Sequence, residues 1–199
     1  MLGSEIEALS FQIIQEEVSF SQYDRYEAEV VARVIHASAD PTFASTMVFS
    51  VEAAPTMVGL IQSGSRLITD VKSLKTLINT ASTICALESS FPPIQGKTRS
   101  YAAMYHAARK FGVKDTIFVV GCAPTALDAL LDLDDTFSDP PCIVALPVGY
   151  VGAAESKKTL LETNYTYITN VGRRGGTAVT AAAINALYKM ATGVFQLKH

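Results

Sequence analysis

The chain has 199 residues, of which 49% are hydrophobic and 18% are charged, and its formal net charge is −3. This length suits one domain, residues 1–199, with a substantial core, and the composition is that of a folded chain rather than a disordered one. The slight negative charge gives no general basis for binding nucleic acid or a membrane surface. An anionic ligand would therefore depend on local basic groups.

The cysteines and the apolar runs indicate the cellular compartment in which the protein works. Cys85, Cys122 and Cys142 are widely spaced, with no CxxC pair and no Cys/His grouping, which favours reduced thiols over a disulfide framework or a zinc site. No apolar run approaches the roughly 20 residues of a membrane span. The first residues include acidic ones and lack the basic and apolar regions of a signal peptide. We expect a cytoplasmic protein that holds no metal of its own and does not enter a membrane.

Two helices are predicted at the start of the chain. The first covers about residues 3–18, because apolar residues recur with helical spacing at Ile6, Leu9, Ile13 and Ile14. Ser10 falls on the same face, where a bond to the preceding turn and a functional contact are both open. The second helix has Asp24 as its cap and ends before Asp40-Pro41.

His36 is the candidate acid–base residue. It lies off the apolar stripe of Val30 and Val34, shares a face with Arg33, and stands in the last turn of the helix, where the dipole favours a protonated imidazole. An ordinary solvated His-Arg face is the alternative. We interpret His106 as structural or solvated, so His36 is the side chain left for proton transfer near neutral pH.

From residue 43 onward, predicted strands alternate with predicted helices. The strands are Phe43–Phe49, Arg66–Thr69, Thr83–Leu87, Thr116–Val120, Ile143–Leu146 and Tyr165–Ile168; the helices lie near 52–62, 71–79, 98–111, 124–133, 151–162 and 177–191. Pro55 and Pro124 fit a first helical position, and Gly64 and Gly112 fit the position after a helix. This alternation predicts an α/β fold with a doubly wound, mainly parallel sheet and helices on both faces. It does not give the strand order.

Three glycine-containing turns follow predicted strands, at residues 121–127, 147–157 and 170–178. Turns of this kind expose backbone N–H groups at a helix start, and Arg173 and Arg174 add positive charge suited to a carboxylate or phosphate. Neither GxGxxG nor GxxxxGK[ST] is present. Tight βα turns explain any one of these loops, but three together favour an anion site.

Two further positions stand near predicted helix starts. Lys97-Thr98-Arg99-Ser100 places two cations at the opening of a helix, where cations are disfavoured unless an anion joins them. Asp70 ends a predicted strand, and we interpret it as a cap for the next helix rather than a ligand.

These segments resemble the precorrin-8X methylmutase family of corrin biosynthesis over nearly the whole chain. The resemblance rests on Ser10-Phe11, 33–36, 98–100, 123–127, 147–157, 172–176 and 185–187. It implies a flavodoxin-like fold, a homodimer with its active site near the subunit interface, and an isomerase that moves the C-11 methyl of a contracted tetrapyrrole to C-12. No cofactor is implied, because cobalt, where present, is carried in the substrate.

The same resemblance implies the site. His36 matches the proton donor or acceptor, and Ser10 and Arg33 match substrate contacts; in the matching motifs we expect Thr98, Arg99, Gly149, Gly152, Arg173 and Gly176 to bind substrate. Cys122 stands where the family usually has Asn. Residues 35–40 look more like the members that use cobalt-precorrin-8 than the metal-free ones. A non-catalytic corrinoid-binding protein and a flavodoxin-like nucleotide-binding domain are the alternatives.

Overall fold

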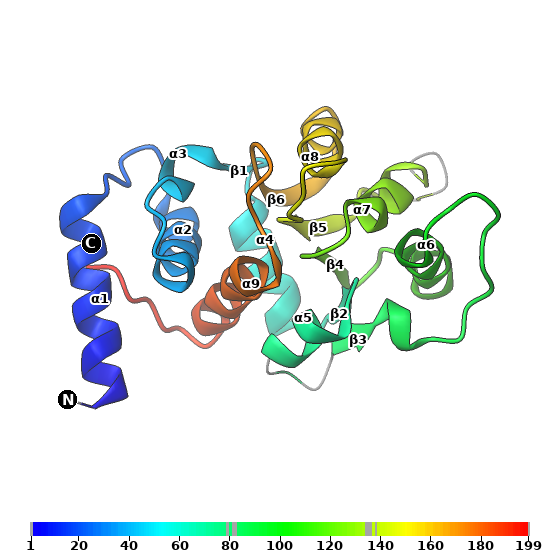
Figure 1. Ribbon diagram of the computed structural model, residues 1–199. Helices are drawn as coiled ribbons and strands as arrows, with labels where there is room; N and C mark the ends of the chain where they lie inside the picture. Colours follow the sequence, from blue (N-terminus) through cyan, green and yellow to red (C-terminus); the bar gives the residue numbers. More distant parts are fainter. Residues whose placement is uncertain (1, 79, 81–82, 134–136, 138, 199) are drawn as a thin grey trace.

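The computed structural model describes residues 2–78, 80, 83–133, 137 and 139–198. In these ranges a six-stranded sheet lies between two groups of helices (Figure 1). The strands are β1 (Met47–Phe49), β2 (Arg66–Thr69), β3 (Thr83–Cys85), β4 (Thr116–Val120), β5 (Cys142–Ala145) and β6 (Thr166–Asn170). The helices are α1 (Gly3–Glu17), α2 (Arg25–Ser38), α3 (Phe43–Thr46), α4 (Ala53–Gln62), α5 (Lys72–Leu77), α6 (Arg99–Phe111), α7 (Pro124–Leu131), α8 (Ala153–Leu161) and α9 (Thr177–Ala191), with a 3₁₀ turn, η1 (Ala86–Glu88).

The strand order is β1-β6-β5-β4-β2-β3. Five strands, from β3 to β6, pair in parallel, and β1 pairs antiparallel with β6 at the edge, with Met47 opposite Asn170. Numbered among themselves, the parallel strands run 2-1-3-4-5, the order of flavodoxin-like sheets. The predicted fold class is therefore confirmed. From β2 the next strand, β3, is added on one side, and β4 and the later parallel strands are added on the other. At such a switch point, here between β2 and β4, folds of this kind open a crevice at the carboxyl ends of the strands.

Alternate residues of each central strand face opposite helix layers. Leu67, Ile117 and Val144 pack toward α1, α2, α4, α5 and α9, and Ile68, Phe118 and Ile143 pack toward α6, α7 and α8. Both layers are apolar because a parallel sheet is buried on its two faces. No helix in the described ranges is long and apolar enough to cross a membrane.

Three local predictions are wrong in part. Residues 43–46 form the short helix α3 rather than the first half of a strand, because the Asp40 carboxylate accepts from Thr42 N (3.0 Å) and turns the chain into a helical turn before β1. The strand predicted to Leu87 ends at Cys85 and continues as η1. Pro55 occupies the third position of α4, not the first.

Other end signals are confirmed. Asp24 caps α2 by accepting from Glu27 N at 2.8 Å, and α2 ends at Ser38. Pro124 opens α7, and Gly112 ends α6 with φ of 69°.

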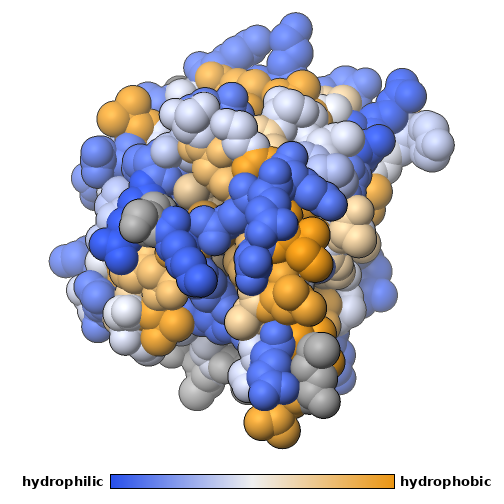
Figure 2. Space-filling view, turned by 90° about the vertical axis from the view of Figure 1, so that its left-hand side faces the viewer, coloured by the Kyte–Doolittle hydropathy of each residue, from blue (hydrophilic) through white to orange (hydrophobic). Residues whose placement is uncertain are grey.

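The first helix buries only one of the four apolar residues that predicted it, Ile14. α1 lies at the outer side of α2, at the left of Figure 1. It buries Phe11 and Ile14, whereas Ile6, Leu9 and Ile13 are 53%, 45% and 45% exposed. Figure 2 looks onto this end of the molecule and shows hydrophobic patches at the surface between hydrophilic side chains. The apolar stripe on α1 therefore does not pack on the core of its own chain.

Candidate active site

The His36 ring is held by two residues of α1. The Ser10 hydroxyl and His36 Nδ1 share a hydrogen bond of 2.7 Å, and the Phe11 ring stacks on the imidazole with centroids 5.2 Å apart. When Ser10 donates, the neutral ring carries its proton on Nε2. When Nδ1 carries the proton instead, Ser10 accepts from it and Nε2 is free to take a proton. In either case Ser10 and Phe11 fix the orientation of the His36 ring.

A charged cluster lies beside this ring. Arg33 Nη1 donates to Glu7 Oε1 at 2.5 Å, and Lys189 Nζ on α9 donates to the same oxygen at 2.9 Å. The Arg33 side chain is only 11% exposed, it sits over the Phe11 ring, and its Nε and Nη2 atoms are buried without a hydrogen-bond partner. Two cations and one carboxylate leave this cluster with a positive charge. That charge suits an anionic group of a ligand.

The cluster and His36 line one groove of about 610 Å³. The groove runs between α2 and α9, and its lining also includes Ala37, Leu77, Ala178, Ala181, Ala182, Asn185 and Tyr188. A second hollow, of about 360 Å³, lies on the other side of His36 against the apolar stripe of α1. His36 is therefore reachable from two directions, both of them largely apolar.

The pKa of His36 lies below its ordinary value. Burial is the largest cause, and the positive charge of Arg33 adds to it, while Glu7 opposes both. The helix end favours a protonated ring, but burial and Arg33 outweigh it. These contacts favour the neutral ring, and the imidazolium of His36 is a stronger acid than a free imidazolium.

Burial also raises the pKa of Glu7, but the hydrogen bonds from Arg33, Lys189 and Gln196 outweigh it and lower the pKa to about 2. Glu7 is therefore ionised at neutral pH.

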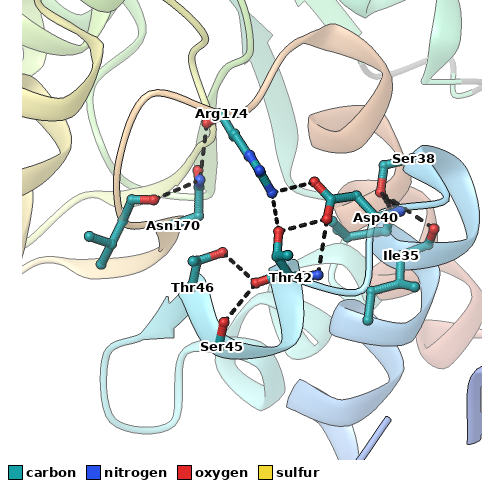
Figure 3. Close-up of polar contacts among 10 residues, drawn as sticks. Ile35, Ser38, Asp40, Thr42, Ser45, Thr46, Asn170 and Arg174 are labelled. Carbon is teal, nitrogen blue, oxygen red and sulfur yellow. Dashed lines mark hydrogen bonds and ion pairs between the residues drawn. The ribbon is translucent and has the colours of Figure 1, made fainter. Parts of the chain in front are cut away.

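The glycine-containing loop before α9 is tied to the end of α2. Figure 3 shows the Arg174 side chain reaching Asp40 and Thr42, with an ion pair of 2.6 Å between Arg174 Nη1 and Asp40 Oδ2. The hydrogen bond from Thr42 and the Arg174 charge hold the pKa of Asp40 below its usual range. Arg174 was expected to supply free positive charge for an anion, but Asp40 already neutralises it. Asp40 lies four residues after His36 in the chain, so this ion pair ties residues 172–176 to the end of the helix that carries His36.

The same loop packs closely on the loop after β5. Gly149 N donates to the Arg173 carbonyl at 3.2 Å, and Gly176 N donates to the Leu146 carbonyl at 2.8 Å. A Cβ on Gly175, whose φ is 150°, would lie 2.1 Å from the Leu146 oxygen, so no other residue fits there. Arg173 is exposed and lies over the Tyr150 ring at 5.5 Å. Gly149, Gly152, Arg173 and Gly176 are thus brought to one rim at the carboxyl ends of the strands.

Thr98 and Arg99 lie farther along this rim and line a different hollow. Thr98 caps α6, and its hydroxyl meets that of Thr125 on α7 at 2.7 Å. Arg99 is exposed and, with Thr98 and Lys97, borders a hollow of about 390 Å³ beside residues 87–93. α6 and α2 lie on opposite faces of the sheet and at opposite ends of Figure 1. One chain therefore does not bring Arg99 into the groove of His36.

In the first of the three glycine-containing turns, residues 121–127, a carboxylate of the same chain already occupies the expected anion site. The buried Asp70 carboxylate accepts from the backbone N–H groups of Gly121 (3.2 Å), Cys122 (2.8 Å) and Ala123 (2.8 Å) at the start of α7. Burial raises its pKa even though these donors oppose the rise. Asp70 thus caps α7 rather than the next helix. It occupies the crevice between β2 and β4, where a flavodoxin-like protein would take a phosphate.

Three charged residues in or near the site are not among the residues predicted from the sequence. Glu7 stands three residues before Ser10 and so shares its face on α1, a signal that the sequence contains. Lys189 gives no comparable signal, because only tertiary packing brings it to Glu7. Lys157 was noted only as part of a motif, yet it is 1% exposed and donates to Asn170 Oδ1 and the Arg174 carbonyl. Within the described ranges no group of three His, Cys, Asp or Glu side chains could hold a metal ion.

Comparison with known proteins points to one family. The family described as precorrin-8X methylmutase matches residues 5–190. The cobalt-precorrin-8 methylmutase of Salmonella typhimurium is 35% identical over 198 residues, covering 92% of each chain. The precorrin-8X methylmutase of a Sinorhizobium species is 33% identical over 198 residues, covering 93% of each. The crystal structure of the precorrin-8X methylmutase from Thermus thermophilus superposes with a TM-score of 0.85 at 30% identity, covering 96% of this chain and 97% of that one.

Proposed function

Because the chain belongs to the precorrin-8X methylmutase family, we propose that it moves the C-11 methyl group of precorrin-8X or cobalt-precorrin-8 to C-12. The protein would act as one domain, residues 1–199, with His36 as the catalytic residue. The observation that carries this proposal is the His36 ring, fixed by Ser10 and Phe11 in a groove that also contains the Glu7, Arg33 and Lys189 charges.

His36 supplies a proton to the corrin ring system or accepts one from it. The reaction is an intramolecular shift, so it needs no nucleophile, and protonating a ring nitrogen makes the migrating bond easier to break. The lowered pKa of His36 supports this role, since a more acidic imidazolium gives its proton more readily. Ser10 and Arg33 act next to this ring, Ser10 by orienting it through Nδ1 and Arg33 by adding positive charge.

The carboxylates at the edge of the substrate bind to the rim. Arg173 supplies charge, and Gly149, Gly152 and Gly176 let the substrate approach backbone N–H groups at the starts of α8 and α9. Thr98 and Arg99 bind a more distant carboxylate. The large flat ring fits the apolar walls of the groove.

We further propose that the enzyme uses no separate cofactor, works in the cytoplasm, and takes cobalt-precorrin-8 in preference to the metal-free ring. The resemblance of residues 35–40 to the cobalt-using members supports the last point.

A homodimer is part of the same proposal. The exposed apolar stripe of α1 and the hollow beside it, which reaches Ser10 and His36, support an interface at this end of the molecule. A partner there would cover the stripe and enclose the second side of His36.

Incubation of the purified protein with each substrate tests the activity. We expect the visible spectrum to change to that of hydrogenobyrinate or cobyrinate, faster with the cobalt form. Tight binding without conversion would instead favour a non-catalytic corrinoid-binding protein. Absence of both would reject the proposed function.

A further inference from the structure

Lys157 on α8 is a buried cation that the proposed chemistry does not use. It is 1% exposed, and its neighbour Lys158 on the same helix is exposed. A buried lysine is rare unless it is paired, because its charge loses hydration. None of the ion pairs recorded in the described part of the chain includes Lys157. Burial lowers the pKa of its ammonium to about 8.

The two acceptors of this ammonium lie at the end of β6 and in the loop that precedes α9. Lys157 Nζ donates to Asn170 Oδ1 at 3.0 Å and to the Arg174 carbonyl at 2.7 Å. Asn170 Nδ2 donates to the same carbonyl at 3.0 Å, as Figure 3 shows. The Arg174 carbonyl is therefore held from two sides.

The held segment, residues 172–176, carries groups of the rim. Arg173 precedes the carbonyl that Lys157 binds, and Gly176 follows it at the start of α9. The segment has little freedom on its outer side, since Gly175 packs against the Leu146 and Pro147 carbonyls. A shift of the Arg174 peptide would move Arg173 and the first N–H groups of α9 together.

We propose that Lys157 is a positioning residue: by holding the Arg174 carbonyl it fixes residues 172–176 so that Arg173 and the start of α9 meet the substrate carboxylates. This inference rests on the proposed function. It assigns to Lys157 an effect on substrate binding and not on the proton transfer at His36.

The test compares Lys157→Met with Lys158→Met, which removes an equal charge from the exposed side of α8. Amide hydrogen exchange of residues 173–178 reports on the loop without substrate. We expect exchange at least about tenfold faster in Lys157→Met. The free energy needed to open the loop falls by the contribution of the lost charge-assisted hydrogen bond. Lys158→Met should exchange like wild type, and unchanged exchange in Lys157→Met overturns the proposal.

Titration with the corrin product then tests the link to binding. The dissociation constant should rise about ten- to hundredfold in Lys157→Met, while kcat at saturation changes by less than about threefold. Arg173→Ala should weaken binding less in the Lys157→Met background than in wild type, because Arg173 is already displaced. Unchanged affinity, or a fall in kcat alone, overturns the positioning role.

Two outcomes separate this proposal from others. If Lys157→Met does not fold, Asn170→Ala should show the same faster exchange and weaker binding; failure of both variants to fold would make Lys157 purely structural and overturn the proposal. If the wild type neither binds nor converts a corrin, the proposed function fails and the role in substrate binding fails with it. The exchange result still decides whether Lys157 holds the loop.

Discussion

His36 is fixed by residues that lie 25 and 26 positions earlier in the chain. Ser10 bonds to Nδ1, and Phe11 stacks on the ring. These contacts leave Nε2 as the atom available for a substrate proton. A proton donor acts well only when its reacting atom is held in position, so α1 is as much a part of the site as α2.

Replacing His36 with Ala tests the catalytic role. The side chain fills no core position, since Val30 and Val34 form the buried stripe of α2, so we expect a folded protein. Turnover should fall about 10²–10⁴-fold, the usual worth of a positioned proton donor. Corrin binding should persist, because the rim is unchanged. Turnover assays with a corrin titration check both; wild-type turnover would remove His36 from the mechanism, and lost binding would make it a substrate anchor.

The sign of the pH dependence follows from the lowered pKa of His36. If the protonated ring is the catalyst, turnover falls as pH rises through that pKa, which lies below the ordinary 6.5. The His36→Ala variant should lack this limb of the profile.

Glu7 gives a stability prediction. Its pKa is lowered from 4.5 to about 2, so the folded state binds fewer protons than the unfolded state between these values. The ionised carboxylate therefore stabilises the fold above pH 4.5, and this stabilisation is lost as pH falls toward 2. We expect a loss of about 1–2 kcal/mol, reduced from the full shift because the side chain is partly solvated. Urea unfolding of wild type and Glu7→Gln across this range checks it. The variant should lose less stability than wild type over this range, because only the contribution of Glu7 is removed and carboxylates such as Asp40 still contribute. Equal slopes for both proteins would contradict the role of the cluster.

At the scale of elements, the loop between β6 and α9 gives two adjacent arginines different partners. Arg174 is turned toward Asp40 and joins the loop to the end of α2, whereas Arg173 is exposed beside Tyr150. The same sequence motif thus supplies one tether and one free cation. The two side chains differ in their partners: the Arg174 guanidinium pairs with the Asp40 carboxylate, and the Arg173 guanidinium lies over the Tyr150 ring.

Arginine variants test this division of roles. Arg173→Ala and Arg99→Ala should each weaken corrin binding by about 1–3 kcal/mol, the range for hydrogen bonds to charged groups. Arg174→Ala is the matched control and should change binding by less than about 1 kcal/mol, since it loses only a surface ion pair. Added salt should weaken wild-type binding. Titration of the visible absorption band of the corrin measures the affinity of all three variants. Equal losses of affinity in Arg173→Ala and Arg174→Ala would reject the distinction.

At the scale of the whole molecule, two helices bear on the proposed homodimer. The Ala-rich stretch 177–186 of α9 has small residues that would allow close packing between subunits, but most of them are buried within the chain, where α9 packs against α2. The apolar stripe of α1 remains uncovered. Exposed apolar stripes of this kind are typical of interfaces.

Charge placed on that stripe should disrupt the proposed homodimer. We expect Ile13→Lys to shift sedimentation equilibrium toward monomer at micromolar concentration, because burying an unpaired ammonium at an interface is costly. Gln12→Lys, at the exposed neighbouring position, should leave the dimer intact. A wild-type protein that is monomeric throughout would refute the dimer, and an unaffected Ile13→Lys dimer would place the interface elsewhere.

The sequence by itself determined the fold class, most elements and the family. Alternating strands and helices, the Asp24 cap and the Pro124 start are local signals, and local backbone preference and hydrophobic period decide them. The motifs from Ser10 to Gly176 were enough for the resemblance to the methylmutases, because they keep their order and spacing along the chain.

Tertiary structure alone decided how these residues meet. Strand order, the seating of Asp70 on the start of α7, the pairing of Glu7 with Lys189, and the direction of the His36 pKa all depend on contacts between distant segments. A helical period identifies an apolar stripe, but it does not say whether the core or another molecule covers that stripe, as α1 demonstrates. The physical reason is that burial and electrostatic fields sum over neighbours in space, and sequence spacing fixes only the neighbours within one element.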